Sequence, residues 1–247
     1  MLDATTPTVV TMKHATLYLA DANELLHRLG RVLLVADPPY LFDNSGGGAF
    51  RAARGASDQI VAERLDEGFD HTIINPLLHP SVVVFCHNDQ LPELLTYLTG
   101  NYRRVCVHVW IKPNPSPHRN KHYLADTEFY VVASDDISDT EFFIHAWQEG
   151  YHPVGAHHDM HRHVTAPSQP SKVYGHPTVK PDAVMDKIIA NMGDGIICDP
   201  FMGTGSTGVA AVKAGRTFIG IEHNPKHFAT AVERLRLAHE QRVHAPP

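Results

Sequence analysis

Two short stretches of the chain place an aspartate at the start of a turn. Asp37 opens "DPPY" at 37–40, and Asp199 opens "DPFMGTG" at 199–205. Each follows an apolar run, "RVLLVAD" or "GIICD", that is typical of a strand buried on both faces. If the two strands are parallel in one sheet, both aspartates lie at its carboxyl edge, where such sheets bind their ligands.

The tetrapeptide Asp37, Pro38, Pro39 and Tyr40 suits the activation of an exocyclic amine. The amino group of adenine or cytosine is a weak nucleophile because its lone pair is delocalised into the ring. Hydrogen bonds from this group to Asp37 and to the Pro38 carbonyl draw the nitrogen toward tetrahedral geometry. The prolines stiffen the turn, and Tyr40 offers a ring on which a base removed from the helix stacks.

The loop after Asp199 carries Gly203, Gly205 and Gly208 at the G-x-G-x-x-G spacing of a dinucleotide-binding loop. Glycines allow close approach of the backbone, and the next helix offers free N–H groups. A carboxylate at Asp199 repels a pyrophosphate but suits an ammonium or sulfonium centre. S-adenosylmethionine carries both, so we expect it rather than a nicotinamide dinucleotide; Glu222 can bind ribose hydroxyls in either cofactor class.

Strands and helices alternate along most of the chain. The expected strands lie at 15–20, 31–37, 81–87, 103–110, 128–134, 195–199 and 217–222, and the expected helices at 22–30, 91–100, 181–193, 207–215 and 225–243. The alternation predicts an α/β fold with a doubly wound, mostly parallel sheet. The His- and Pro-rich segment 134–175 lacks this pattern, so we expect an irregular insert with a short apolar island at 141–147.

Size and composition favour a single domain over residues 1–247. The chain has 247 residues, of which 43% are hydrophobic, enough for one sizeable core. No apolar run approaches the ~18 residues that span a bilayer, and the N-terminus lacks a signal-peptide pattern, so we expect a cytoplasmic protein without a membrane partner. Cys86, Cys106 and Cys198 lie in apolar runs without C-x-x-C spacing and are expected to be buried and reduced.

Basic residues are concentrated in two segments although the net charge is −6. Residues 103–122 hold five lysines or arginines and no acid, and the glycine-rich segment 45–58 holds two arginines. Contacts to phosphates need only a local basic surface. These segments are either DNA-facing or ordinary solvated surface, and the candidate DNA-binding residues are Arg51, Arg54, Lys112, Arg119 and Lys121.

Five motifs together resemble the amino-methylating DNA methyltransferases that use S-adenosylmethionine. They are "DPPY" at 37–40, "WIKPNP" at 110–115, "HPTVKP" at 176–181, "DPFMGTGST" at 199–207 and "GIE" at 220–222. Their order resembles the beta group of this N6-adenine and N4-cytosine family, in which the catalytic motif precedes the cofactor loop. The resemblance covers nearly the whole chain and implies a Rossmann-like methyltransferase fold.

The same resemblance implies which residues hold the cofactor. Asp199 is expected near the methionine ammonium, Glu222 at the ribose and Asp21 near the adenine, whereas residues 176–180 are expected beside the methionine part. Phe201, Gly203 and Gly205 are expected to shape the pocket. The expected cofactor-binding residues are Asp21, His176, Thr178, Lys180, Asp199, Phe201, Gly203, Thr204, Gly205 and Glu222.

The function expected from these features is site-specific methylation of adenine N6 in double-stranded DNA, of the restriction-modification type. An aspartate opens the tetrapeptide, whereas family members that act on cytosine N4 tend to have serine there, so N4-cytosine methylation is the first alternative. A nicotinamide-dependent oxidoreductase and a catalytically silent DNA-binding relative are less favoured. The recognition segment is short for the family, so either it reads a short site or a homodimer supplies more surface.

Two further features each have a structural alternative. Trp110 suits core packing as well as the lining of a DNA or cofactor site. His157, His158, His161 and His163 include an i, i+4 pair that would bind zinc on a helix. No helix is expected there and methyl transfer to an amine needs no metal, so we favour a DNA-facing loop and expect no metal.

Overall fold

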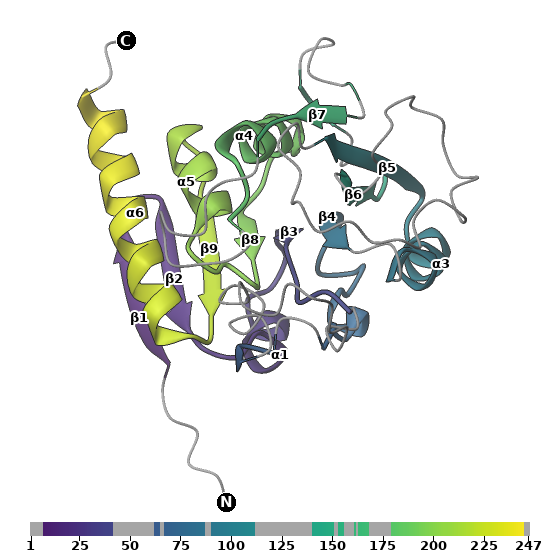
Figure 1. The fold of residues 1–247 in the computed structure, drawn as a ribbon, viewed down its shortest axis with the longest axis horizontal. Coiled ribbons are helices and arrows are strands. Elements are labelled where there is room, and N and C mark those ends of the chain that lie inside the picture. The colour runs from purple at the N-terminus through teal and green to yellow at the C-terminus, as the bar shows by residue number, and fades with distance from the viewer. Residues whose placement is uncertain are drawn as a thin grey trace, which may run out of the picture.

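A computed structural model describes residues 7–41, 62–64, 67–86, 90–111, 140–150, 153–155, 161, 163–167 and 179–244. The strands of this part of the chain form one sheet in the order β1-β2-β9-β8-β3-β4-β6-β5-β7, which Figure 1 shows running through the molecule. Their bounds are β1 Thr8–Met12, β2 Ala15–Leu19, β3 Leu33–Ala36, β4 Ser81–Cys86, β5 Arg104–Ile111, β6 Thr140–Trp147, β7 His163–Thr165, β8 Ile197–Asp199 and β9 Phe218–Glu222.

The sheet is mostly parallel, as the sequence predicts. The run β2-β9-β8-β3-β4 is parallel throughout, and β5 pairs with β7 in parallel. Antiparallel pairs join β1 to β2 and place β6 between β4 and β5. The carboxyl ends of β2, β9, β8 and β3 therefore lie side by side at one edge.

Helices pack against both faces of this sheet. Their bounds are α1 Ala22–Leu25, α3 Leu91–Asn101, α4 Asp182–Asn191, α5 Ser206–Lys213 and α6 Pro225–His244, with short 3-10 turns η1 at Leu26–Arg28 and η3 at His71–Ile73. The helix expected at 22–30 is thus a single α-turn followed by η1. The other four expected helices match α3, α4, α5 and α6 to within two residues.

Alternate residues of the central strands enter two separate cores. On β4, Val83 and Phe85 pack with α4, α5 and α6, whereas Val82 and Val84 pack with α1 and α3. All four side chains are at most 1% exposed. This alternation follows from the two-residue period of a strand and explains why β3 and β4 read as continuous apolar runs.

Three strands are absent from the sequence-based expectation. The segment 134–175, expected to be irregular, contains β6 and β7, and β6 pairs with all six residues of β4 and all eight of β5. The short apolar island at 141–147 is strand β6, which neighbouring strands stabilise on both sides. The third, β1, is a half-exposed strand at the edge of the described sheet, next to β2. The strand expected at 128–134 lies outside the described residues.

The three cysteines are unbridged, and Trp110 is packed in the core. All three cysteines are free; Cys86 and Cys198 are buried and Cys106 is half-buried. Trp110 is 2% exposed, and its Nε1 donates to the Ala166 carbonyl at 2.8 Å. Core packing therefore accounts for this tryptophan. Within the described residues, no helix is long and apolar enough to cross a membrane.

Candidate active site

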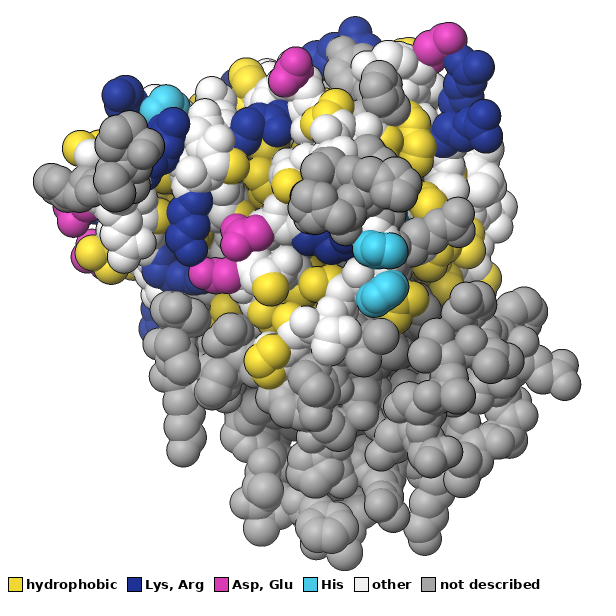
Figure 2. Space-filling model, turned by 90° about the horizontal axis from the view of Figure 1, so that it is seen from above, with side chains coloured by type: hydrophobic (Ala, Val, Ile, Leu, Met, Phe, Trp, Pro, Cys, Tyr) yellow, Lys and Arg dark blue, Asp and Glu magenta, His cyan; other side chains and the backbone are white. Residues whose placement is uncertain are grey.

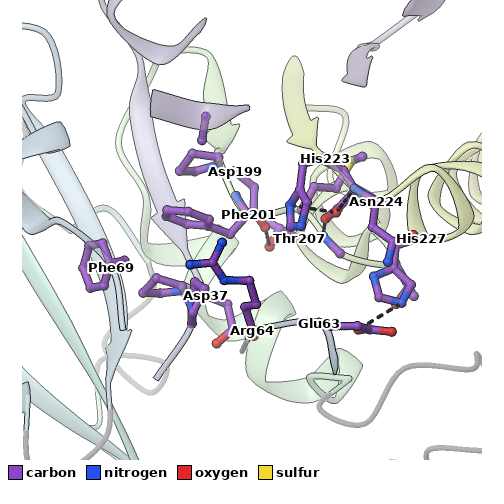
Figure 3. Close-up of a pocket in the computed structure, with 18 of the residues that line it drawn as sticks. Asp37, Glu63, Arg64, Phe69, Asp199, Phe201, Thr207, His223, Asn224 and His227 are labelled. Carbon is purple, nitrogen blue, oxygen red and sulfur yellow. Dashed lines mark hydrogen bonds and ion pairs between the residues drawn. The ribbon is translucent and has the colours of Figure 1, made fainter. Parts of the chain in front are cut away.

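The carboxyl ends of four neighbouring strands surround one cavity of about 510 Å³. Its wall includes Asp21 after β2, Asp37 after β3, Asp199 at the end of β8 and Glu222 at the end of β9. The volume lies within the usual range of ~300–1,000 Å³ for small-molecule sites. The two aspartates that open the sequence motifs therefore do share an edge, and Figure 3 shows both beside the cavity.

The DPPY turn presents Asp37 directly after β3. The Tyr40 hydroxyl donates to Asp37 Oδ1 at 3.1 Å. The Lys180 ammonium donates to both carboxylate oxygens of Asp37, at 2.7 Å each. Gln90 Nε2 reaches the Pro39 carbonyl at 3.4 Å, so the turn is also held from the α3 side. Pro38 is buried, and all four residues of the turn line the cavity.

Asp199 is a buried carboxyl at the start of the glycine loop. Its side chain is held by the loop and by α5: the Phe201 N–H donates to Oδ1 at 3.0 Å, and the Thr207 hydroxyl donates to Oδ2 at 2.6 Å. Burial raises the pKa of Asp199 to about 7, although these two hydrogen bonds oppose the shift; the nearby carboxylates of Asp37 and Glu222 raise it further. A positive charge entering the cavity would favour the ionised form.

Glu222 fixes the glycine loop to the end of β9. The Gly203 N–H donates to Glu222 Oε2 at 2.8 Å, and the Asn224 N–H donates to Oε1 at 2.7 Å. The backbone of Gly203 and Gly205 has φ values of 52° and 84°, the left-handed region that glycine tolerates best. A carboxylate and a tight loop thus form one wall of the cavity.

The third glycine of the loop has a different role. Gly208 lies within α5, where an added Cβ would stand 2.6 Å from Phe218 of β9 and 3.0 Å from Leu235 of α6. Its lack of a side chain lets α5 approach the sheet and α6 closely. Gly208 therefore serves packing.

Of the other described cofactor candidates, Asp21, Phe201, Thr204 and Lys180 line the same cavity. Gly205 is not among the lining residues; an added Cβ there would stand 2.9 Å from Leu235 of α6. Asp21 caps α1 by accepting the Asn23 N–H at 2.8 Å, and Thr204 and Phe201 line the wall. The Phe201 ring meets Phe69 edge-on at 5.9 Å between centroids. His176 and Thr178 lie outside the described residues. Lys180, expected beside the methionine part, lines this cavity and donates to Asp37.

Comparison with known proteins agrees with this geometry. Residues 33–233 match a family of N6 and N4 methyltransferases described as DNA methylase. The chain belongs to this family. The methylase is 26% identical over 242 residues to the type II methyltransferase M2.LlaDCHI of Lactococcus lactis subsp. cremoris, a match that covers 90% of each chain. A stretch of 66 residues, 26% of this chain and 22% of the relative, is 46% identical to the DNA adenine methyltransferase YhdJ of Escherichia coli K12.

A solved structure of an S-adenosylmethionine complex is also similar to the methylase. The M1.HpyAVI–SAM complex superimposes with a TM-score of 0.61 at 27% identity, covering 90% of this chain and 99% of that one. The predicted family, its Rossmann-like fold and its cofactor class are therefore confirmed. Membership of this family also overturns the nicotinamide reading of the three-glycine spacing.

Several residues that line the methylase cavity were not anticipated. His223 and Asn224 directly follow Glu222, so their position after a strand end was a usable signal. His227 of α6 lies 3.6 Å from Glu63, as the dashed line in Figure 3 shows, and Phe69 closes the wall beside Phe201. Nothing local in the sequence marks Glu63, His227 or Phe69, because distant segments bring them together.

The candidate DNA-binding residues Arg51, Arg54, Lys112, Arg119 and Lys121 lie outside the described residues. So do His157 and His158, whereas His161 and His163 are exposed, with ring centroids 5.6 Å apart. On the coloured part of the face seen in Figure 2, lysine and arginine side chains are scattered among hydrophobic and acidic ones. The described residues contain no group of three or more potential metal-binding side chains.

Proposed function

We propose that this DNA methylase transfers a methyl group from S-adenosylmethionine to the N6 amine of adenine at specific sites in double-stranded DNA. The observation that carries the proposal is the position of Asp37. This carboxylate and Tyr40 stand at the end of β3, in the same cavity as Asp199 and Glu222 at the ends of β8 and β9. An amine-binding turn and a cation-binding wall therefore share one space.

The residues of the cavity fit S-adenosylmethionine. The buried carboxyls Asp199 and Glu222, at 3% and 6% exposure, match the cationic methionine end and the ribose hydroxyls of this cofactor. Asp21 and Phe201 supply a carboxylate and a ring on the same wall. When bound, the cofactor supplies an electrophilic methyl group on a sulfonium centre.

The catalytic turn supplies the groups that make the amine reactive. Asp37 accepts a hydrogen bond from the target NH₂, and the Pro38 carbonyl, fixed by its position between two ring-restricted residues, accepts another. The Tyr40 hydroxyl holds Asp37 in place at 3.1 Å. These acceptors raise the reactivity of the nitrogen lone pair by positioning, with no covalent bond between enzyme and base.

Adenine is favoured over cytosine by the first residue of the turn. The family resemblance associates an aspartate at this position with N6-adenine methylation, and the short, 46% identical match is to a protein named as an adenine methyltransferase. We further propose that the methylase acts in the cytoplasm and that a second copy of the chain contributes to DNA recognition. The restricted length of segment 134–175 supports a dimer.

Methyl transfer to mixed-sequence duplex DNA tests the proposal. The protein is incubated with duplex and S-adenosylmethionine labelled in its methyl group, and label in DNA is counted. Wild type is expected to label DNA, Asp37→Ala to lower the rate at least about 10²-fold, and Asp194→Ala, an exposed aspartate before β8, to match wild type. Equal labelling by Asp37→Ala and wild type would refute the role of Asp37.

A further inference from the structure

Lys180 is a buried ammonium in direct contact with the catalytic carboxylate. Its side chain is 4% exposed, against 24% for Asp37, and its Nζ lies 2.7 Å from each carboxylate oxygen. The two residues are 143 positions apart in the sequence. The same Nζ lies 4.8 Å from the centre of the Phe85 ring and 5.4 Å from that of Tyr40.

Burial of this ammonium is costly unless opposite charge surrounds it. An isolated buried charge is strongly unfavourable, whereas a carboxylate that accepts from it with both oxygens, together with two aromatic faces, offsets much of that cost. Val179 and Pro181 on either side are also buried, and α4 begins at Asp182, so the backbone of Lys180 is fixed as well. The lysine is therefore held where it meets Asp37.

Asp37 needs such a partner because its surroundings are acidic. The charged or titratable described residues that line the cavity with it are Asp21, Tyr40, Glu63, Arg64, Glu67, Asp70, Lys180, Asp199, Glu222, His223 and His227. Asp199, at the end of the neighbouring strand β8, and Glu222, at the end of β9 one strand further, repel an ionised Asp37. An ammonium at 2.7 Å opposes this repulsion and favours the carboxylate form.

We propose that Lys180 is a positioning residue that keeps Asp37 ionised and oriented for the target amine. Before DNA binds, the ammonium occupies both carboxylate oxygens of Asp37. When the target base enters, its NH₂ takes one oxygen and Lys180 keeps the other. The proposal rests on the proposed function for its catalytic consequence, but the ion pair itself can be tested without methyl transfer.

The decisive variant is Lys180→Met, which keeps most of the side-chain length and removes the charge. We expect kcat to fall about 10²-fold and the acidic limb of the pH–kcat profile to move to higher pH by at least about one unit, because Asp37 without its ammonium binds a proton more readily. Binding of S-adenosylmethionine, measured by calorimetry, is expected to stay within about twofold of wild type. Lys213→Met, which breaks an exposed 2.9 Å ion pair with Asp182, should leave kcat, the pH–kcat profile and cofactor affinity unchanged.

A cofactor dissociation constant raised tenfold or more in Lys180→Met, with an unmoved pH profile, would overturn the proposal and place Lys180 at the methionine end.

Thermal unfolding gives a second test that does not depend on activity. Lys180→Met alone should lower the unfolding midpoint, and adding Asp37→Asn to it should restore part of the loss, because no uncompensated buried charge is left. Strictly additive effects would contradict the ion pair. Absence of methyl transfer by wild type would instead refute the proposed function, and the unfolding comparison of the single and double variants would still test the ion pair.

Discussion

Replacing Asp199 by asparagine should stabilise the methylase while weakening its hold on the cofactor. Burial raises the pKa of this carboxyl to about 7 from an ordinary value of 3.8. The unfolded chain therefore releases the proton at lower pH than the folded protein does. As pH rises from about 4 to about 7, the free energy of unfolding of the wild-type protein therefore falls. Above about pH 7 this loss of unfolding free energy stays constant.

The size of this loss follows from the two pKa values. Each pKa unit of difference between the folded and unfolded states corresponds to about 1.36 kcal/mol. Above pH 7, Asp199 therefore lowers the free energy of unfolding by up to about 4 kcal/mol. Asparagine has the same shape and does not titrate. Its carbonyl can accept the Phe201 N–H, and its amide can donate to the Thr207 hydroxyl, so both hydrogen bonds have a replacement.

Urea unfolding of both proteins at pH 5, 6, 7 and 8 measures the effect. The advantage of Asp199→Asn over wild type should grow by about 2–3 kcal/mol between pH 5 and pH 8. Calorimetry at pH 8 should show S-adenosylmethionine binding weakened roughly 10- to 100-fold, since a charged partner is lost. Asp194→Asn, at an exposed position, should show neither change. A stability difference that does not vary with pH would refute the reasoning on Asp199.

Two packing and anchoring predictions use matched variants. Gly208→Ala should lower the unfolding free energy by about 1–3 kcal/mol, because its Cβ would meet Phe218 at 2.6 Å. The same change at Gly100 of α3, where nothing lies within 4 Å, should raise it by about 0.5–1 kcal/mol in the same urea assay; a loss at both sites would contradict the packing argument. Arg234→Met should weaken cofactor binding about tenfold, because Nη1 of Arg234 donates to the Thr204 carbonyl at 2.7 Å and hydroxyl at 3.0 Å. Exposed Arg236→Met on the same helix should bind the cofactor as wild type does, and equal affinities for both arginine variants would exclude the anchoring role.

Much of the sheet could be predicted because its central strands are buried on both faces. Such strands read as unbroken apolar runs, and the turn residues that follow mark their ends, so β3, β4, β8 and β9 were located within two residues. The irregular reading of 134–175 was wrong at β6, whose pairing with β4 and β5 depends on segments far away in sequence. Edge strand β1 has neither an apolar run nor full burial to reveal it.

The site shows the same division between local and long-range information. Asp37 directly follows β3, and Asp199 and Glu222 end β8 and β9, so local pattern and parallel pairing suffice to bring them together. The partner of Lys180 lies 143 positions away in the sequence, and no spacing rule encodes this pairing. The raised pKa of Asp199 likewise depends on its full burial and on two neighbouring carboxylates.

Nucleoside analysis of methylated DNA tests the central claim most directly. Duplex DNA of mixed sequence is treated with the wild-type protein and S-adenosylmethionine, digested to nucleosides and examined by mass spectrometry, with Asp37→Ala as the matched control. The proposed function predicts N6-methyladenine that depends on Asp37. Methyl groups found only on cytosine, or N6-methyladenine formed equally by Asp37→Ala, would contradict it.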